Sequence, residues 1–163
     1  MFDAMFAWLE TTAFSVWMRE SPSLLAFPGI LAAHTVGLGL LAGLHGALAL
    51  RLLGVGRTIA PAAFTRFLPI MWLGLWMNVL SGIALLLAYP TKALTNPLFY
   101  LKLALIAVAL LILRATLRRI AADTLGATKL LAAASLMTWA ATITAGRLLA
   151  YTCTRLMVDS ICS

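Results

Sequence analysis

Long apolar runs, separated by short polar or basic breaks, dominate the pattern along this chain. The runs cover about residues 29–53, 67–89, 98–117 and 130–151. Each run reaches the roughly 20 residues that an α-helix needs to cross a bilayer. The pattern therefore predicts an all-α integral membrane protein, in which residues 22–151 form a bundle of four spanning helices.

The segment before these runs has a different pattern. Asp3, Glu10 and Arg19 interrupt any spanning run, while apolar residues recur at three- and four-residue steps: Phe2, Phe6, Leu9, Ala13 and Val16. Trp8 and Trp17 suit the boundary between lipid and water. We expect residues 1–21 to form an amphipathic interfacial helix that lies in the membrane surface.

Composition supports a membrane location. Of the 163 residues, 63% are hydrophobic and only 10% are charged, and the mean hydropathy is +1.03. Soluble domains carry about 25% charged residues, and a chain of this length with four spans leaves no room for a soluble catalytic domain. The net charge of +7 would suggest nucleic acid in a soluble protein. Here the basic residues gather at helix ends, so we expect no nucleic-acid partner.

The charges predict the orientation. Seven basic residues border the first and third connections and face Asp123 alone: Arg51, Arg57, Arg66, Arg114, Arg118, Arg119 and Lys129. By the positive-inside rule this side faces the cytoplasm, so both termini lie outside a bacterial inner membrane. The acidic N-terminal segment does not resemble a cleavable signal peptide, so the first span is expected to be an uncleaved anchor.

The tail, residues 152–163, carries Cys153 and Cys162 and would lie on the oxidising side. A small disulfide loop that fixes the tail is favoured over free thiols. A metal site at this spacing is the weaker alternative.

The candidate chemistry lies in the first run, which holds the only two histidines, His34 and His45. Eleven residues at 100° each make three turns plus 20°, so both imidazoles leave one face, about 16 Å apart along the axis. Ionisable groups inside a membrane are costly and indicate a functional site. We favour metal or haem ligation by both; simple hydrogen bonding across helices is the alternative.

Other residues fit this hypothesis. Leu38 and Leu41 share the histidine sector and would form an apolar wall for haem, and Gly37 borders it and could make room for a porphyrin. The opposite face carries Gly39, Gly43 and Gly46, which would allow close helix packing. In the second run, Asn78 and Ser81 could hydrogen-bond the second histidine nitrogen.

Four basic residues could bind haem propionates. Lys102 and Arg147 lie at about the depth expected for His34, and Arg51 or Arg66 could do so at the inner side. The alternative is that they snorkel to lipid headgroups.

One helix cannot supply both axial ligands to a single iron, because its two imidazoles point the same way and lie too far apart. Each histidine would therefore bind a separate metal. A two-fold homodimer would place each histidine opposite its own copy and would share two bis-histidine haems across the interface.

The two in-register histidines, His34 and His45, within a four-helix unit resemble those of the di-haem membrane cytochromes b. The layout also resembles small uncharacterised bacterial four-span membrane proteins. The resemblance implies b haems and transmembrane electron transfer, often with quinone. Cytochromes b carry a second histidine pair on another helix, and this chain has none, so the source of the second ligands differs.

We therefore expect a haem b membrane protein that carries electrons, with a quinol donor and a periplasmic carrier as acceptor. One alternative is a protein for copper or another transition metal, which would need methionines near the histidines; the candidates are Met71, Met77 and Met137. Another alternative is a structural subunit of a larger membrane complex. The spans carry no carboxylate pair and no familiar nucleophile motif, so enzymatic activity stays open.

Overall fold

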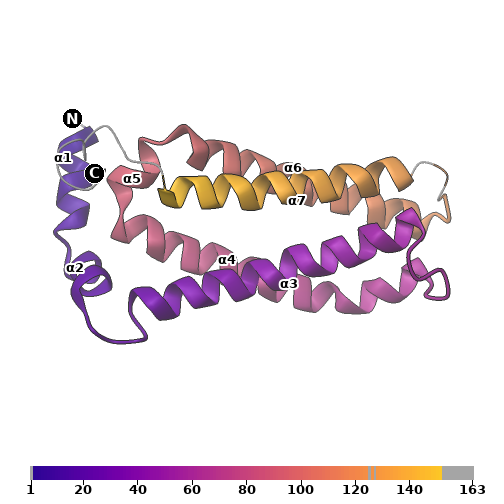
Figure 1. Ribbon diagram of the computed structural model, residues 1–163, viewed down its shortest axis with the longest axis horizontal. Coiled ribbons are helices and arrows are strands. Elements are labelled where there is room, and N and C mark those ends of the chain that lie inside the picture. The colour runs from indigo at the N-terminus through magenta and orange to yellow at the C-terminus, as the bar shows by residue number, and fades with distance from the viewer. Residues whose placement is uncertain (1, 125, 127, 152–163) are drawn as a thin grey trace.

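The computed structural model describes residues 2–124, 126 and 128–151, which form helices joined by short connections. Four long helices lie side by side (Figure 1): α3 (Phe27–Leu53), α4 (Leu68–Ala88), α6 (Pro97–Ala121) and α7 (Thr128–Tyr151). This confirms the all-α prediction, and the ends of the four helices lie close to those expected from the apolar runs.

Three of these helices are long and apolar enough to cross a membrane: Phe27–Leu53, Pro61–Ala88 and Pro97–Ala121, the second including the 3₁₀ turn η1 (Pro61–Phe67) before α4. The fourth long helix, α7, has 24 residues. Its place as a fourth span stays a prediction.

Local signals explain where the helices begin and end. Pro28 lies in the first turn of α3, where the missing N–H has no intrahelical partner to lose. The same helix ends at Gly54, whose φ of 111° is a left-handed conformation that favours glycine. The side chain of Asn96 accepts a hydrogen bond of 2.9 Å from the backbone N–H of Leu98 and so caps the start of α6.

The bundle consists of two helical hairpins. Helix α3 packs on α4, α6 packs on α7, and the hairpins meet chiefly where α3 contacts α7. The closest approach of α3 and α4 is at Gly37 and Gly74. A Cβ on Gly37 would lie 2.8 Å from the carbonyl oxygen of Gly74, and a Cβ on Gly74 would lie 2.9 Å from that of Gly37.

The prediction that Gly39, Gly43 and Gly46 allow close helix packing is wrong for the helices of this chain. A Cβ on Gly39 or Gly43 would meet no atom within 4 Å, and one on Gly46 would only touch Leu136 at 3.8 Å. The close helix contact uses Gly37 instead. A helical wheel gives the relative directions of side chains, but it does not reveal which sector faces a neighbouring helix.

The N-terminal segment forms two short helices rather than the single one expected, α1 (Phe2–Glu10) and α2 (Ala13–Glu20). The break lies at Thr12, whose hydroxyl caps α2 by accepting a hydrogen bond from the Ser15 N–H at 3.4 Å. Both helices lie across one end of the bundle in Figure 1. Trp8 and Trp17 on them are 66% and 41% exposed, as suits an interfacial segment.

Polar contacts attach these short helices to the end of α4. Arg19 donates hydrogen bonds to the carbonyl oxygens of Ala88, at 2.8 Å, and Glu10, at 2.6 Å. The hydroxyl of Ser15 donates to the carbonyl of Leu87. These bonds satisfy carbonyls that the helix end leaves without intrahelical donors.

The outer surface of the bundle is apolar. Only 6% of the apolar window of α6 is buried, and Trp72, Trp76 and Leu111 are each more than half exposed. A water-soluble monomer rarely shows so much contiguous apolar surface, so the surface matches contact with a lipid bilayer. Cys153 and Cys162 lie outside the described residues.

Candidate ligand site at His34 and the buried His45

His34 joins three helices through its ring. The side chain leaves α3 half-buried; its Nδ1 lies 3.0 Å from the Ser81 hydroxyl on α4, and its Nε2 lies 3.3 Å from the Lys102 ammonium on α6. The contact with Ser81 is the one expected from the sequence. Lys102 was also expected at about the depth of His34, and its ammonium lies next to the ring.

The neighbours of His34 fix the position of its proton. The Ser81 hydroxyl has one hydrogen, and it donates this to the Met77 carbonyl oxygen at 2.5 Å. The hydroxyl oxygen therefore accepts at Nδ1, so Nδ1 of His34 carries the proton. Lys102 can only donate when charged, which requires a lone pair on Nε2. Both contacts thus indicate the same tautomer, with a lone pair on Nε2 that accepts from Lys102.

Two further features hold this part of α3 against α4. Asn78 donates a hydrogen bond of 2.8 Å to the backbone carbonyl of His34, rather than to the ring as expected. Gly82 lies beside the imidazole, and a Cβ there would lie 3.4 Å from Cε1 of His34. The backbone at His34 is therefore held against α4, and the imidazole packs beside a glycine of that helix.

Lys102 is a cation without an acidic partner on the long helices. Its side chain runs along Gly146 of α7, where a Cβ would lie 3.6 Å from Cε of Lys102. The sequences of α3, α4, α6 and α7 contain no Asp or Glu. Charged groups at membrane depth normally pair with one another or mark a ligand path. The cation at this position therefore favours an anionic ligand.

His45 lies in a different environment. Its side chain is 2% exposed, and the indole Nε1 of Trp139, itself 4% exposed, donates to its Nδ1. An indole N–H can only donate, so Nδ1 of His45 must accept. The proton of the neutral ring is then on Nε2, which is the opposite tautomer to that of His34.

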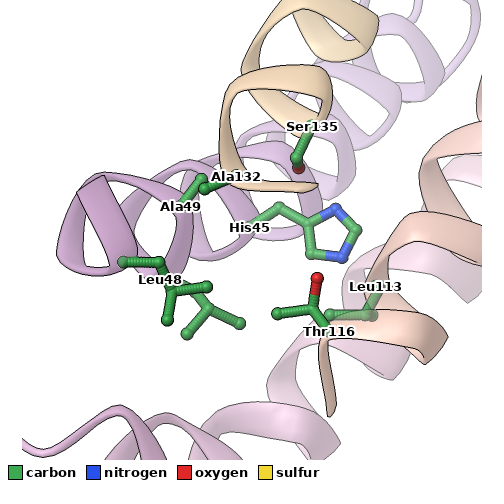
Figure 2. A pocket seen from close by; sticks show the side chains of 8 residues that line it. His45, Leu48, Ala49, Leu113, Thr116, Ala132 and Ser135 are labelled. Atoms are coloured by element: carbon green, nitrogen blue, oxygen red, sulfur yellow. The ribbon is translucent and has the colours of Figure 1, made fainter. Parts of the chain in front are cut away.

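The Nε2 atom of His45 is buried and has no hydrogen-bond partner among the described residues. It lies at a small cavity of about 10 Å³ (Figure 2), lined by His45, Leu48, Ala49, Leu52, Leu113, Thr116, Ala132 and Ser135. Sites for drug-sized ligands and cofactors have about 300–1,000 Å³. The space next to His45 therefore does not fit a porphyrin.

The remaining predicted site residues form no hydrogen bond with either histidine ring among the described contacts. Leu41 is 3% exposed in the apolar core with Leu38 packed against that core. Arg51 donates to the Arg57 carbonyl at 3.0 Å and to the Ile59 carbonyl, and so fixes the α3–α4 connection. Arg147 is exposed.

The described positions of the three candidate methionines do not indicate a metal site shared with a histidine. Met71 lies in the apolar core, Met77 packs near Gly37 and Met137 is 72% exposed. Within the described part of the chain, no group of three or more His, Cys, Asp or Glu residues could hold a metal ion.

Trp139 is a hydrogen-bond partner of His45 that the sequence does not predict. Its residue type suits packing as well as hydrogen bonding, and it lies 94 residues from His45. The only sequence signal is its position on an apolar helix at a depth compatible with His45.

No protein-family model, curated protein or solved structure matches this chain.

Proposed function

We propose that this chain is an integral membrane protein that binds haem b through His34 and carries electrons across or within the bilayer. The observation that carries the proposal is the state of His34. Its Nδ1–H is held by Ser81, and its Nε2 carries a lone pair that accepts from Lys102. Metal-binding histidines usually have this arrangement, because a hydrogen bond at one nitrogen fixes the tautomer and orientation of the other.

Lys102 supplies the second supporting argument. Haem b carries two propionate groups, and a cation without a carboxylate partner matches that charge. The ammonium now lies 3.3 Å from the nitrogen that would bind iron, so it must withdraw when haem binds. The flexible stem of a lysine permits this withdrawal. Arg147 follows Gly146, the residue that Lys102 contacts, and is exposed on the same part of α7.

Haem b, when bound, supplies one-electron redox chemistry. In this proposal His34 holds and orients the group, Lys102 compensates the propionate charge, and the apolar neighbours exclude water. Leu38, one turn along the same face of α3, contributes to the apolar wall.

We restrict the proposal to one haem for each chain. Trp139 occupies Nδ1 of His45, and Nε2 carries the proton, so neither nitrogen offers a lone pair to iron. Two haems ligated by His34 and His45, as the resemblance to di-haem cytochromes b suggests, would require repacking around Trp139. Both rings lie between helices of their own chain, so this packing does not favour a haem shared between subunits.

The wider setting is part of the same proposal. We place the protein in the bacterial inner membrane with α7 as a fourth span and both termini outside, because the basic residues gather at the ends of α3 and α6 and around the connections that follow them. A homo-oligomer, a quinol donor and a periplasmic carrier stay predictions. For the copper alternative, Met71 lies in the apolar core and Met137 is 72% exposed, so neither supports a site shared with a histidine, and no observation favours a purely structural subunit.

A visible spectrum of the purified protein tests the proposal. The protein is expressed with ample haem, purified in detergent and assayed for haem per chain by extraction and by a reduced-minus-oxidised difference spectrum. We expect sharp haem b bands at one haem per chain, loss of the bands in His34→Ala, and retention in His45→Gln. A protein without haem, or a His34→Ala variant that keeps it, would refute the proposal.

A further inference from the structure

We infer that the cavity beside His45 is a binding site for a single water molecule, held between α3, α6 and α7. This water site is independent of haem. The Nε2–H group of His45 is a hydrogen-bond donor on a side chain that is 2% exposed, and it has no partner in the described part of the chain. Buried polar groups are nearly always hydrogen-bonded to protein or to ordered water.

Two hydroxyl groups line the same cavity. Thr116 on α6 is 4% exposed and Ser135 on α7 is 7% exposed. Figure 2 shows the Thr116 oxygen on the same side of the ring as one imidazole nitrogen and the Ser135 side chain above the ring. Neither hydroxyl forms a hydrogen bond with another described residue. The unpartnered Nε2–H of His45 and these two hydroxyl groups therefore line one small space in the described part of the chain.

The size of the space identifies the occupant. A water molecule needs about 10–15 Å³ of cavity by this measure, and the cavity has about 10 Å³. A water molecule there would accept from Nε2–H of His45 and could donate to the oxygens of Thr116 and Ser135. This gives the roughly three hydrogen bonds that buried waters usually make. A metal ion does not fit, because the nitrogen that faces the cavity already carries a proton.

The location gives this water a structural role. His45 belongs to the first hairpin, whereas Thr116 and Ser135 belong to the second. The water thus bridges the two hairpins, one turn of α7 away from Trp139. The direct Trp139–His45 hydrogen bond and the bridging water together satisfy both nitrogens of this histidine.

Histidine-selective ¹⁵N labelling tests the site, because the chain contains only two histidines. We expect NMR spectra in lipid to show His45 protonated at Nε2, with a cross peak between this proton and water. A proton on Nδ1, or an Nε2 proton without contact to water, would overturn the inference. The His34 signals report on the haem proposal separately, so failure of either proposal is recognised by itself.

Variants identify the lining groups. The double variant Thr116→Val with Ser135→Ala is expected to lose the water cross peak, while Thr116→Ser keeps it. Thr142→Val is the matched control, because the Thr142 hydroxyl on α7 already donates to the Thr138 carbonyl at 2.7 Å. A cross peak that persists in the double variant at wild-type strength would refute the assigned site. If the double variant does not fold, the wild-type cross peak between the His45 Nε2 proton and water tests the site by itself.

Discussion

The contact of Gly37 with α4 gives a prediction whose size follows from the structure. In Gly37→Ala the new Cβ would lie 2.8 Å from the Gly74 carbonyl oxygen, 2.9 Å from the backbone nitrogen of Asn78 and 2.9 Å from Cβ of Met77. Ordinary contacts begin at 3.4 Å, so the shortfall is 3.4 − 2.8 = 0.6 Å at the closest atom. None of these atoms can rotate away, and the helices must therefore separate.

This separation has a cost of about 1–3 kcal/mol, as in overpacked cores. It also strains the hydrogen bond from Asn78 to the His34 carbonyl, which contributes about 1 kcal/mol. The higher helix propensity of alanine offsets about 0.8–1.0 kcal/mol. We expect a net loss of about 1–3 kcal/mol in the free energy of unfolding, and weaker haem binding because Ser81 moves away from His34.

Gly43→Ala is the matched control on the same helix, because a Cβ there meets no atom within 4 Å. It should leave stability unchanged or raise it by about 0.5–1 kcal/mol. Thermal unfolding in detergent, followed by tryptophan fluorescence, measures both variants; each kcal/mol changes Tm by roughly 2–4 °C at this chain length. Equal stability of Gly37→Ala and wild type would refute the reasoning. A Gly43→Ala variant that is equally destabilised would show that another chain covers that face.

Three other variants test the remaining contacts. Ser81→Ala removes the group that fixes the histidine tautomer and should weaken haem affinity about 10–100-fold, measured by haem titration; unchanged affinity would argue against that role. Arg19→Gln should release the N-terminal helices, seen as faster hydrogen exchange in residues 2–20, whereas the exposed control Glu20→Gln should leave exchange unchanged. Gly146→Leu should displace Lys102 and lower the haem content. The control Gly146→Ala should not, because its Cβ would make an ordinary 3.6 Å contact with the lysine side chain. Equal haem content in both variants would contradict the position assigned to the Lys102 side chain.

Hydropathy alone located the long helices to within a few residues, because a span must be apolar over a length that the bilayer fixes. The break at Thr12 was not predicted, because a threonine within an amphipathic pattern is compatible with both a helix and a cap. The depth of Lys102 near His34 was predicted from the helix lengths, whereas Ser81 was one of two polar candidates for a contact with either histidine. The different states of the two histidines could not be predicted, because they depend on the donors that distant helices bring to each ring.

The arrangement of the helices also has a consequence for how the protein assembles. Because α3 pairs with α4 and α6 pairs with α7, each half can insert as a sequence-local hairpin before the halves associate. The contacts of His34 with Lys102 and of His45 with Trp139 both cross between the halves. The histidine environments therefore form only at the final docking step, and their spectroscopic signals distinguish the assembled bundle from two inserted but separate hairpins.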